Sequence, residues 1–508
     1  TTPYMSQVSR SYQVALGQDQ LRQRMAFALS QILVVSDRAD ALSGDHFGVA
    51  EYWDILARNA FGNYRTLLEE VTKSPMMGRY LTHFRNRKST PALATTPISP
   101  DENYAREIMQ LFTVGLIERN LDFTPVLAGN EPIATYDQND ITELARVFTG
   151  WSYACGANQT PAQCNTYSGL NSGVASYQPM ACFPAYMDFD AKTIIGNSQI
   201  AAVPGGVVCG TTNGGQTSNT GTPSDPNVQQ TCRTYCTQQI DDALDVLFHH
   251  PNTAPFVSRQ LIQRFVTSNP SAAYIARVAA VFEDNGSGVR GDLGAVIQAV
   301  LLDDEAREPP LAPDAPYGKL REPLLRLTAV WRAFGVTPPV AVNGEVLMGI
   351  RNPQDNLAQR PLGAPTVFNF YEPDYQPPGA LGVEVEFAPE FQIANETTVM
   401  TSGNELWNRI WAGYSTSSGN LTVPGDRAHL NIADLVPLVS GAQATGTTAY
   451  DAFLDELSLR LMYGTMSPEL RASMKNFLRF SIVGAPDNVE ILTTLHVLVM
   501  TPDFMIQR

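Results

Sequence analysis

The stretch PDENYAREIMQLFTVGL, residues 100–116, indicates a helical fold because its apolar side chains recur three and four residues apart. A proline and an aspartate open it, and the apolar side chains then share one face of a helix. That face comprises Tyr104, Ile108, Leu111, Phe112 and Gly115. The other face carries Glu102, Asn103, Arg106, Glu107 and Gln110. Three interpretations of this polar row are open: a solvated face, a buried network that joins helices, or a ligand-binding site.

The same helical periodicity continues on both sides of this stretch, while the alternation typical of strands is scarce. Short strands are expected only within 185–210 and 382–388. One helix is predicted to begin at Asp140, with Glu143 three residues on completing a capping box. We therefore predict a mainly α protein, with a large multi-helix body, an irregular disulfide-bearing insertion and little β structure.

The insertion is predicted from its composition, which is rich in Gly, Thr, Asn, Gln and Pro. It divides the chain into a helical part at 1–151, the insertion at 152–239 and a second helical part at 240–508. All the cysteines lie inside it, at Cys155, Cys164, Cys182, Cys209, Cys232 and Cys236. An even number of cysteines in a loop-rich stretch predicts disulfides and an oxidising compartment. Zinc is the alternative, but CRTYC is the only tight cysteine pair, and zinc sites usually repeat one.

Composition and charge exclude several classes of function. The chain has 508 residues and a formal net charge of -16, from 34 basic and 50 acidic residues. A surface this acidic repels the phosphate backbone of nucleic acids. Nucleic acid is therefore not expected as a partner. No apolar run is long enough to span a membrane. Because the chain starts with Thr1 rather than methionine, we expect it to follow a cleavage or to be a fragment.

Motifs for catalysis and for metal or cofactor binding are missing from the sequence. There is no Gly-x-Ser-x-Gly, no P-loop and no His-Glu-x-x-His. The glycines of GSGVRG, residues 286–291, have the spacing of a dinucleotide fingerprint, but they lie in a turn between two predicted helices and do not follow a strand, as that fingerprint requires. The 6 histidines are scattered. DNGSGVRGD lacks the spacing of a calcium-binding EF-hand loop, and we interpret it as a turn between helices that Asp292 caps. No metal and no cofactor is predicted.

The loop PLGAPTVFNFYEPDYQPPG, residues 361–379, supplies further candidate ligand-binding residues. Its prolines and glycines predict a loop, and Arg360 precedes it. Asn369 and Tyr371 stand among several aromatic residues. Aromatic rings with amide and hydroxyl groups suit a carbohydrate-binding cleft, but the same rings could pin the loop into the core.

The segment GKLREP adds Arg321 and Glu322 at the start of a predicted helix. Arg321 could bind a ligand carboxylate or sulfate, or form an ion pair at the helix start. Buried carboxylates need partners, so we expect Arg106 and at least one of Arg321 and Arg360 within ion-pair reach of the acids at 102–107.

Several motifs in order along the chain resemble the bacterial domain of unknown function 1800 family. They are LRQRMAFALSQILVVSD, PDENYAREIMQLFTVGL, ELARVFTGW, HPNTAPFVSRQLIQRFVTSNPS, GVRGDLGAVIQAVLLDDEAR, GKLREPLLRL and PLGAPTVFNFYEPDY. The resemblance implies a secreted, mainly helical bacterial protein, often encoded beside a secreted sulfatase-like protein. This chain has fewer residues before LRQR than is usual in the family, and Met187 stands where a histidine is common, before Asp188 and Lys192.

Together these features predict a secreted binding or assembly protein whose partner is an extracellular polysaccharide or a secreted sulfatase-like protein. The alternative is an extracellular polysaccharide hydrolase or lyase that uses Glu102 and Glu107. Residues five apart on a helix point about 140° apart, so these carboxylates converge poorly. A second carboxylate would then have to come from elsewhere, for example Glu322 or Glu372. Whether the chain is an enzyme, and its oligomeric state, stay open.

Overall fold

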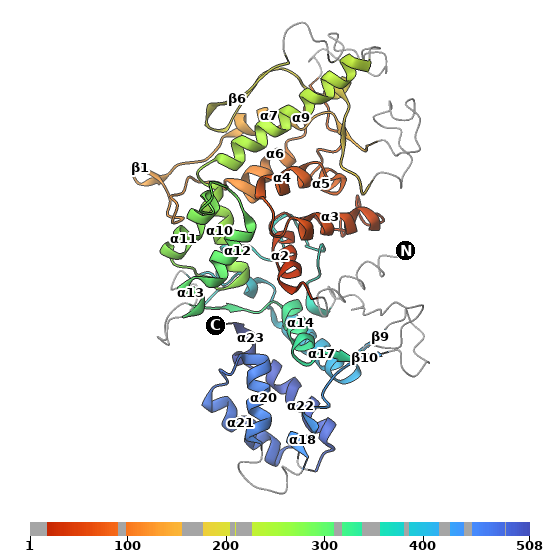
Figure 1. Cartoon of the computed structure of the whole chain (residues 1–508), viewed down its shortest axis with the longest axis vertical. Coiled ribbons are helices and arrows are strands. Elements are labelled where there is room, and N and C mark those ends of the chain that lie inside the picture. Colours follow the sequence, from red (N-terminus) through yellow and green to blue (C-terminus); the bar gives the residue numbers. More distant parts are fainter. Residues whose placement is uncertain are drawn as a thin grey trace.

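The computed structural model shows an elongated, mainly helical molecule, which confirms the predicted fold class (Figure 1). It describes residues 18–89, 98–154, 176–203, 209, 226–308, 317–337, 356–379, 386–415, 427–440, 450–482 and 484–507. The α-helices are α2 (Gln20–Ser30), α3 (His46–Arg58), α4 (Tyr64–Thr72), α5 (Pro75–Tyr80), α6 (Asn103–Glu107), α7 (Gln138–Val147), α9 (Pro226–His249), α10 (Thr253–Phe265), α11 (Ala272–Glu283), α12 (Leu293–Leu302), α13 (Asp304–Arg307), α14 (Pro323–Phe334), α17 (Glu396–Ala412), α18 (Val436–Val439), α20 (Asp451–Met462), α21 (Pro468–Phe480), α22 (Asp487–Val499) and α23 (Pro502–Met505). A π-helix, η1 (Ile108–Thr113), continues α6.

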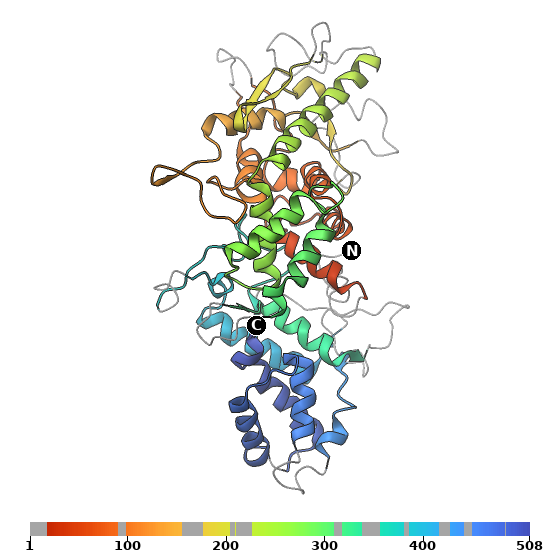
Figure 2. The same ribbon diagram turned by 60° about the vertical axis from the view of Figure 1, so that its left-hand side comes forward.

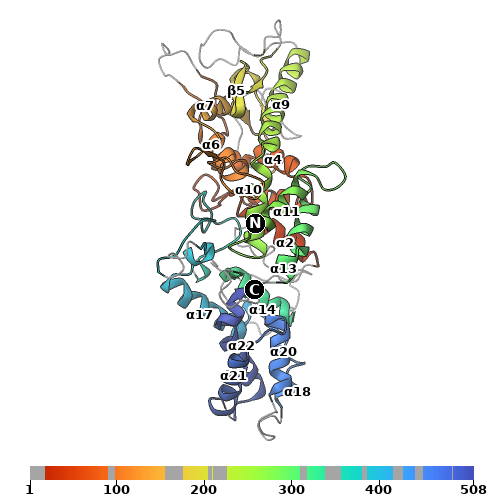
Figure 3. The same cartoon turned by 90° about the vertical axis from the view of Figure 1, so that its left-hand side faces the viewer.

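Helix α10 lies in the middle of the molecule and is buried along almost its whole length. It contacts α2, α9, α11, α12 and η1, and Figure 3 shows it between the N-terminal helices and α11. Burial on all sides explains its apolar residues, but α10 also carries Arg259, Gln260 and Arg264. Polar side chains in so buried a helix need partners or a function.

Strands are few and short, as predicted. The pairs are β1 (Leu127–Ala128) with β2 (Glu131–Pro132), β3 (Trp151–Ser152) with β4 (Ala181–Cys182), β5 (Lys192–Ile194) with β6 (Ser198–Ile200), and β11 (Ile506–Gln507) with β7 (Lys319–Leu320). β10 (Arg427–Leu430) pairs with both β8 (Val336–Thr337) and β9 (Tyr414–Ser415). The hairpin β5–β6 confirms the strand prediction within 185–210, but the expectation that strands occur only there and within 382–388 is wrong, because all the other strands lie outside both segments. Of the other predicted segment, residues 386–388 form no strand, and 382–385 lie outside the described residues.

Disulfides hold the described part of the insertion together, as predicted. Cys182 of β4 bonds to Cys236 of α9, and Cys209 bonds to Cys232 of the same helix. The two cysteines of CRTYC thus have different disulfide partners, which removes the zinc alternative for that pair. Cys155 and Cys164 lie outside the described residues.

Polar contacts attach residues 188–192 of the insertion to α7 and to α9. Arg146 of α7 pairs with Asp188 at 2.9 Å, and Lys192 donates to the Gln239 side chain of α9 at 3.0 Å. Burial lowers the pKa of Lys192 to about 8, against the opposing effect of Asp188. Met187 is buried, and its sulfur accepts a hydrogen bond from Thr149. At this position the chain therefore has core packing in place of a histidine.

One helix start differs from the prediction. α7 begins three residues earlier than expected: Asp137, not Asp140, is its N-cap, and Asp140 supplies the returning side chain of the capping box. Asp292 does cap α12, as predicted, by accepting from the Ala295 amide. Asp140 resembles an N-cap in the sequence because both capping-box positions favour a polar side chain.

The C-terminal helices α18, α20, α21 and α22 form a separate small bundle at one end of the molecule (Figure 2). The chain then returns towards the middle, where β11 pairs with β7. Among the described residues, no helix has both the length and the apolar character that a bilayer-spanning helix requires.

Candidate functional site

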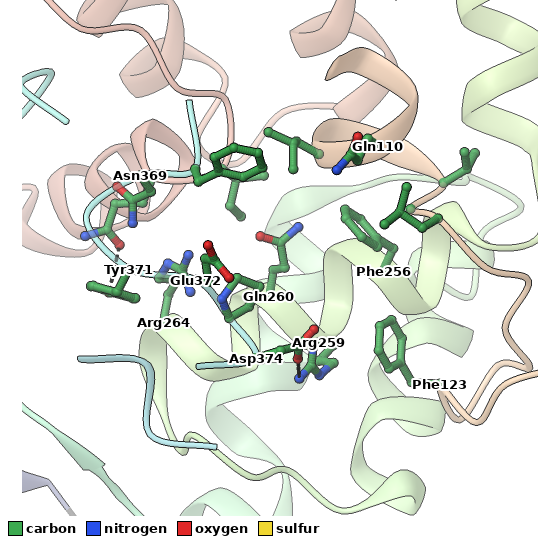
Figure 4. Close-up of a pocket in the computed structure, with 18 of the residues that line it drawn as sticks. Gln110, Phe123, Phe256, Arg259, Gln260, Arg264, Asn369, Tyr371, Glu372 and Asp374 are labelled. Carbon is green, nitrogen blue, oxygen red and sulfur yellow. Dashed lines mark hydrogen bonds and ion pairs between the residues drawn. The ribbon is translucent and has the colours of Figure 1, made fainter. Parts of the chain in front are cut away.

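A pocket of about 400 Å³ lies beside the central helix α10 (Figure 4). Its lining comes from four stretches of the chain, within residues 31–32, 110–123, 256–264 and 367–374. Arg264 and Tyr371 are each only 1% exposed, whereas Leu116 and Phe368 are 57% and 46% exposed. The pocket therefore has a buried polar floor and an exposed apolar rim.

The π-helix η1 positions one wall of this pocket. Its wide turn is closed by the hydrogen bond from the Val114 amide to the Met109 carbonyl, 2.9 Å long. An extra residue in the turn shifts the helix face, so that Gln110 and Leu111, from opposite faces of the predicted helix, both line the pocket. Isolated π-turns often occur at functional sites. Gly115, at φ +71, then ends the helix.

Helix α10 supplies the opposite wall. Phe256, Gln260 and Arg264 are four residues apart and therefore lie in one row along the helix, with Arg259 beside that row. Figure 4 shows Gln260 and Arg264 pointing from α10 towards the pocket. The Nε and Nη1 atoms of Arg264 are buried and make no hydrogen bond in the described part of the chain.

Asn369 lies in the loop that covers the third side of the pocket. Its φ of +68 is unusual for a residue other than glycine, although asparagine tolerates this region better than most residues. The side chain is 5% exposed, and neither its Oδ1 nor its Nδ2 has a hydrogen-bond partner within the described structure. An unpaired buried amide costs stability and is unusual. Asn369 is thus available to a ligand.

A chain of side-chain contacts leads down from the pocket floor. The Tyr371 hydroxyl lies 3.4 Å from Gln31 Oε1, and Gln31 Nε2 donates to Glu322 at 2.5 Å. Gln359 donates to the same carboxylate. Burial, with the negative Glu322 nearby, raises the pKa of Tyr371 well above its ordinary value. Tyr371 is therefore a neutral phenol and a hydrogen-bond donor.

Beneath this floor lies a buried ionic cluster, which we define as Arg264, Lys319, Glu322 and Glu390 together with Arg24, which is partly buried. Lys319 pairs with Glu390 at 2.8 Å, with both side chains 1% exposed. Burial alone would raise the pKa of Glu322, but Lys319 and Arg24 outweigh it and lower that pKa. Glu322 is therefore ionised, although it is completely buried.

At the rim, cations and aromatic rings alternate. The guanidinium groups of Arg119 and Arg259 lie 4.4 and 4.7 Å from the centroid of the Phe123 ring. Arg259 also forms an ion pair with Asp374. These contacts leave the rings of Phe256 and Phe368 to form apolar surface near the opening.

The structure brings some of the candidate residues together at this pocket. Gln110, Asn369 and Tyr371 line it, and Glu322 lies one layer below, in contact with Gln31. Two stretches that the sequence suggested separately, 100–116 and 361–379, therefore meet at one site.

The start of the polar row lies elsewhere, on the surface towards α7. Glu102 accepts hydrogen bonds from Gln138 and Thr142 and pairs with Arg106 at 3.6 Å. Asn103 contacts Thr82. For these residues the interpretation as a solvated face with surface contacts between helices describes the structure.

Glu107 is an intermediate case. It is buried, and its Oε2 atom has no hydrogen-bond partner among the described residues. Burial raises its pKa, while Arg106 acts in the opposite direction. Glu107 does not line the pocket, although it is one helical turn from Gln110.

The expected ion pairs of Arg321 and Arg360 with the acids at 102–107 are wrong. Arg321 donates to the Leu461 carbonyl and lies over the Phe504 ring, and Arg360 pairs with Asp37. Neither arginine lines the pocket. The C-terminal bundle and the loop after α2 provide these partners, and local sequence patterns do not show such distant contacts.

The lining residues that were missed as candidates include Gln31, Arg259, Gln260 and Arg264. A signal for three of them was present in SRQLIQR, where polar and apolar residues alternate irregularly within one helix. Such a pattern is easily taken for a solvated face, whereas α10 is buried.

Fold and site together define a mainly α-helical protein that is disulfide-bonded in its insertion and has a polar pocket above a buried ionic cluster. The chain belongs to the family described as Protein of unknown function (DUF1800), which matches residues 4–506. This confirms the resemblance seen in the sequence. No curated protein and no solved structure is detectably similar to the chain.

Proposed function

We propose that this chain is a secreted binding protein and that the pocket beside α10 binds a sugar unit of an extracellular polysaccharide. The observation that carries the proposal is Asn369. Both polar atoms of its amide are buried without partners at the pocket wall, in a backbone conformation that costs free energy. Strain and unsatisfied groups tend to persist where function requires them.

The chemistry of the lining supports a sugar as the ligand. Sugars present hydroxyl groups at their edges and C–H groups on their faces. Asn369, Gln110 and Gln260 offer amides for the hydroxyl groups, and Phe256 and Phe368 offer rings for stacking. Secretion is part of the proposal because the disulfides of α9 are typical of an oxidising compartment.

Hydrolysis by Glu102 and Glu107 has less support. Glu102 is engaged by Gln138 and Thr142 at the surface, and neither carboxylate lines the pocket. The carboxylates that do line it are Glu372 and Asp374; Glu372 is exposed, and Asp374 is paired with Arg259. In this proposal the binding protein holds the polymer, and a secreted sulfatase-like protein is the partner that acts beside it.

A panel of defined neutral, uronate-containing and sulfated oligosaccharides tests this proposal. The protein is screened on an array of the panel, and each hit is measured by titration calorimetry. In Asn369→Gly, glycine accepts the positive φ without strain, so only the amide is lost. We expect this variant to bind each hit at least tenfold more weakly, with unchanged thermal stability.

Asn139→Ala, at an exposed position of α7, is the control and should bind as the wild type does. Undiminished binding by Asn369→Gly would show that the ligand binds elsewhere. An array without any hit would overturn the proposed sugar ligand.

A further inference from the structure

We infer that the floor of the pocket is an anion subsite, in which Arg264 binds a carboxylate or sulfate group of the ligand. This inference rests on the proposed function, because it names the chemical class of the sugar that the same pocket takes. The ligand would be an acidic sugar unit, either a uronate or a sulfated sugar.

The first observation is the charge of the buried ionic cluster. It contains three cations, Arg24, Arg264 and Lys319, but two carboxylates, Glu322 and Glu390. One positive charge is therefore left without a buried counter-charge. A buried charge without a partner is costly, and a bound anion would relieve that cost.

The protonation of Lys319 matters for this charge balance. Its ammonium group has three N–H bonds and three acceptors: the carbonyls of Gln263 and Arg264, at 2.7 and 3.0 Å, and Glu390, at 2.8 Å. A neutral amine would leave one of these acceptors without a donor. The contacts therefore support the charged form, even though burial lowers the pKa of Lys319.

Arg264 is the member of the cluster that faces the pocket. Both carboxylates of the cluster have other polar partners: Lys319 and Ser268 for Glu390, and Gln31 and Gln359 for the Oε2 atom of Glu322. The Oε1 atom of Glu322 is buried and accepts no hydrogen bond from the described residues, Arg264 included. The Arg264 guanidinium lies 5.0 Å from the centroid of the Tyr371 ring, and stacking on that ring limits its movement. Its Nε and Nη1 atoms have no acceptor within the described residues.

The remaining charges of the lining do not cancel this excess. Arg119 and Arg259 line the pocket together with Glu372 and Asp374, which are two cations and two carboxylates. The pocket with its floor thus keeps one positive charge, in a chain whose net charge is -16. A site of opposite sign to the rest of the molecule selects ligands by charge.

Titration calorimetry with small probes tests the inference on the wild-type protein. Glucose, glucuronate and glucose 6-sulfate share one ring and differ in charge, and inorganic sulfate supplies the anion alone. We expect at least one of the two acidic sugars to bind tenfold or more tightly than glucose, with a preference that weakens as salt rises. Comparison of glucuronate with glucose 6-sulfate distinguishes the carboxylate from the sulfate.

Variants of Arg264 then test whether this residue causes the preference for acidic sugars. Arg264→Gln should reduce the preference for the acidic sugar to less than threefold, and Arg264→Lys should keep part of it. Arg58→Gln removes an arginine from the surface, away from the pocket, and should keep the full preference. If Arg264→Gln fails to fold, the comparison of glucose with the acidic sugars on the wild-type protein still shows whether the pocket prefers an anion.

Equal binding of glucose and both acidic sugars would overturn this inference and leave the proposed function intact. Failure of every acidic probe, sulfate included, would also overturn it. The proposed function is judged separately, by the oligosaccharide panel and the Asn369→Gly variant. A preference that survives in Arg264→Gln would assign the anion to another residue and contradict the proposal.

Discussion

Asn369 and Arg264 illustrate at the residue scale how a pocket can reduce the stability of a fold. Each presents buried polar atoms without partners in the described structure, and Asn369 also has a positive φ. Removing such a group would be expected to stabilise the free protein slightly or leave it unchanged. Loss of binding without loss of stability is therefore the signature of a site residue here.

His83 makes a prediction for the pH dependence of stability. It is buried, stacks on Tyr104 with ring centroids 4.0 Å apart and contacts the Thr72 carbonyl. Burial lowers its pKa to about 4, whereas the unfolded imidazole has an ordinary pKa of 6.5. Between these pH values only the unfolded state takes up the proton, so stability is complete near pH 7 and falls as the pH drops.

We expect His83 to account for about 2 kcal/mol of lost unfolding free energy between pH 7 and pH 5, measured by urea denaturation. His83→Gln should remove that share of the fall and leave the share of His250, whose pKa burial also lowers to about 4. His249→Gln, at an exposed position, is the matched control and should keep the wild-type slope. An unchanged slope in His83→Gln would show that other groups cause the pH dependence.

At the scale of elements, the sequence predicted the helices well and the local geometry of the site poorly. The apolar face at Tyr104, Ile108 and Phe112 is fully buried, as its spacing indicated. The π-turn could not be predicted, because one inserted residue leaves the apolar repeat almost unchanged over so short a segment. Yet that turn carries Gln110, which lines the pocket, whereas Glu102, at the start of α6, does not.

Gly115 allows the end of the π-helix to be tested. A Cβ atom at this position would meet the Phe256 ring at 2.9 Å, and the φ of +71 disfavours any other residue. We expect Gly115→Ala to lower the unfolding free energy by about 2–4 kcal/mol in chemical denaturation, since strain and overpacking both act. Weaker ligand binding should accompany the loss, because Phe256 lines the pocket.

Gly129→Ala is the matched control. Gly129 has a φ of +68 but nothing within 4 Å of an added Cβ atom, so only the backbone strain applies. It should cost about 1–2 kcal/mol and leave binding unchanged. Equal losses in the two variants would mean that the close approach to Phe256 contributes nothing.

At the scale of the whole molecule, the buried ionic cluster connects segments from Arg24 to Glu390. No local pattern in the sequence could predict it, since its members lie in separate helices, strands and loops whose own periodicity concerns only nearby residues. The sequence showed Glu322 as a candidate, but not the residues that neutralise it. Long-range packing therefore determines the floor of the site, while local propensity determines the helices around it.

The Lys319–Glu390 pair tests how strongly this cluster holds the molecule together. Lys319→Met leaves the buried Glu390 without its counter-charge, and we expect a loss of about 3–5 kcal/mol in unfolding free energy. The double variant Lys319→Met with Glu390→Gln removes both charges and should recover part of that loss. A double-mutant cycle by urea denaturation measures the difference. Additive losses would show that the two side chains are not coupled.

The return of the chain to the middle of the molecule has a consequence for biosynthesis. Strand β11 pairs with β7, which carries Lys319, and the Gln507 side chain donates to the Phe265 carbonyl at the end of α10. Ribosomes make the chain from its N-terminus, so residues 506 and 507 emerge after every residue that lines the pocket. Until they emerge, the floor lacks one of its strands, and a truncated or still-growing chain should be unable to hold a ligand.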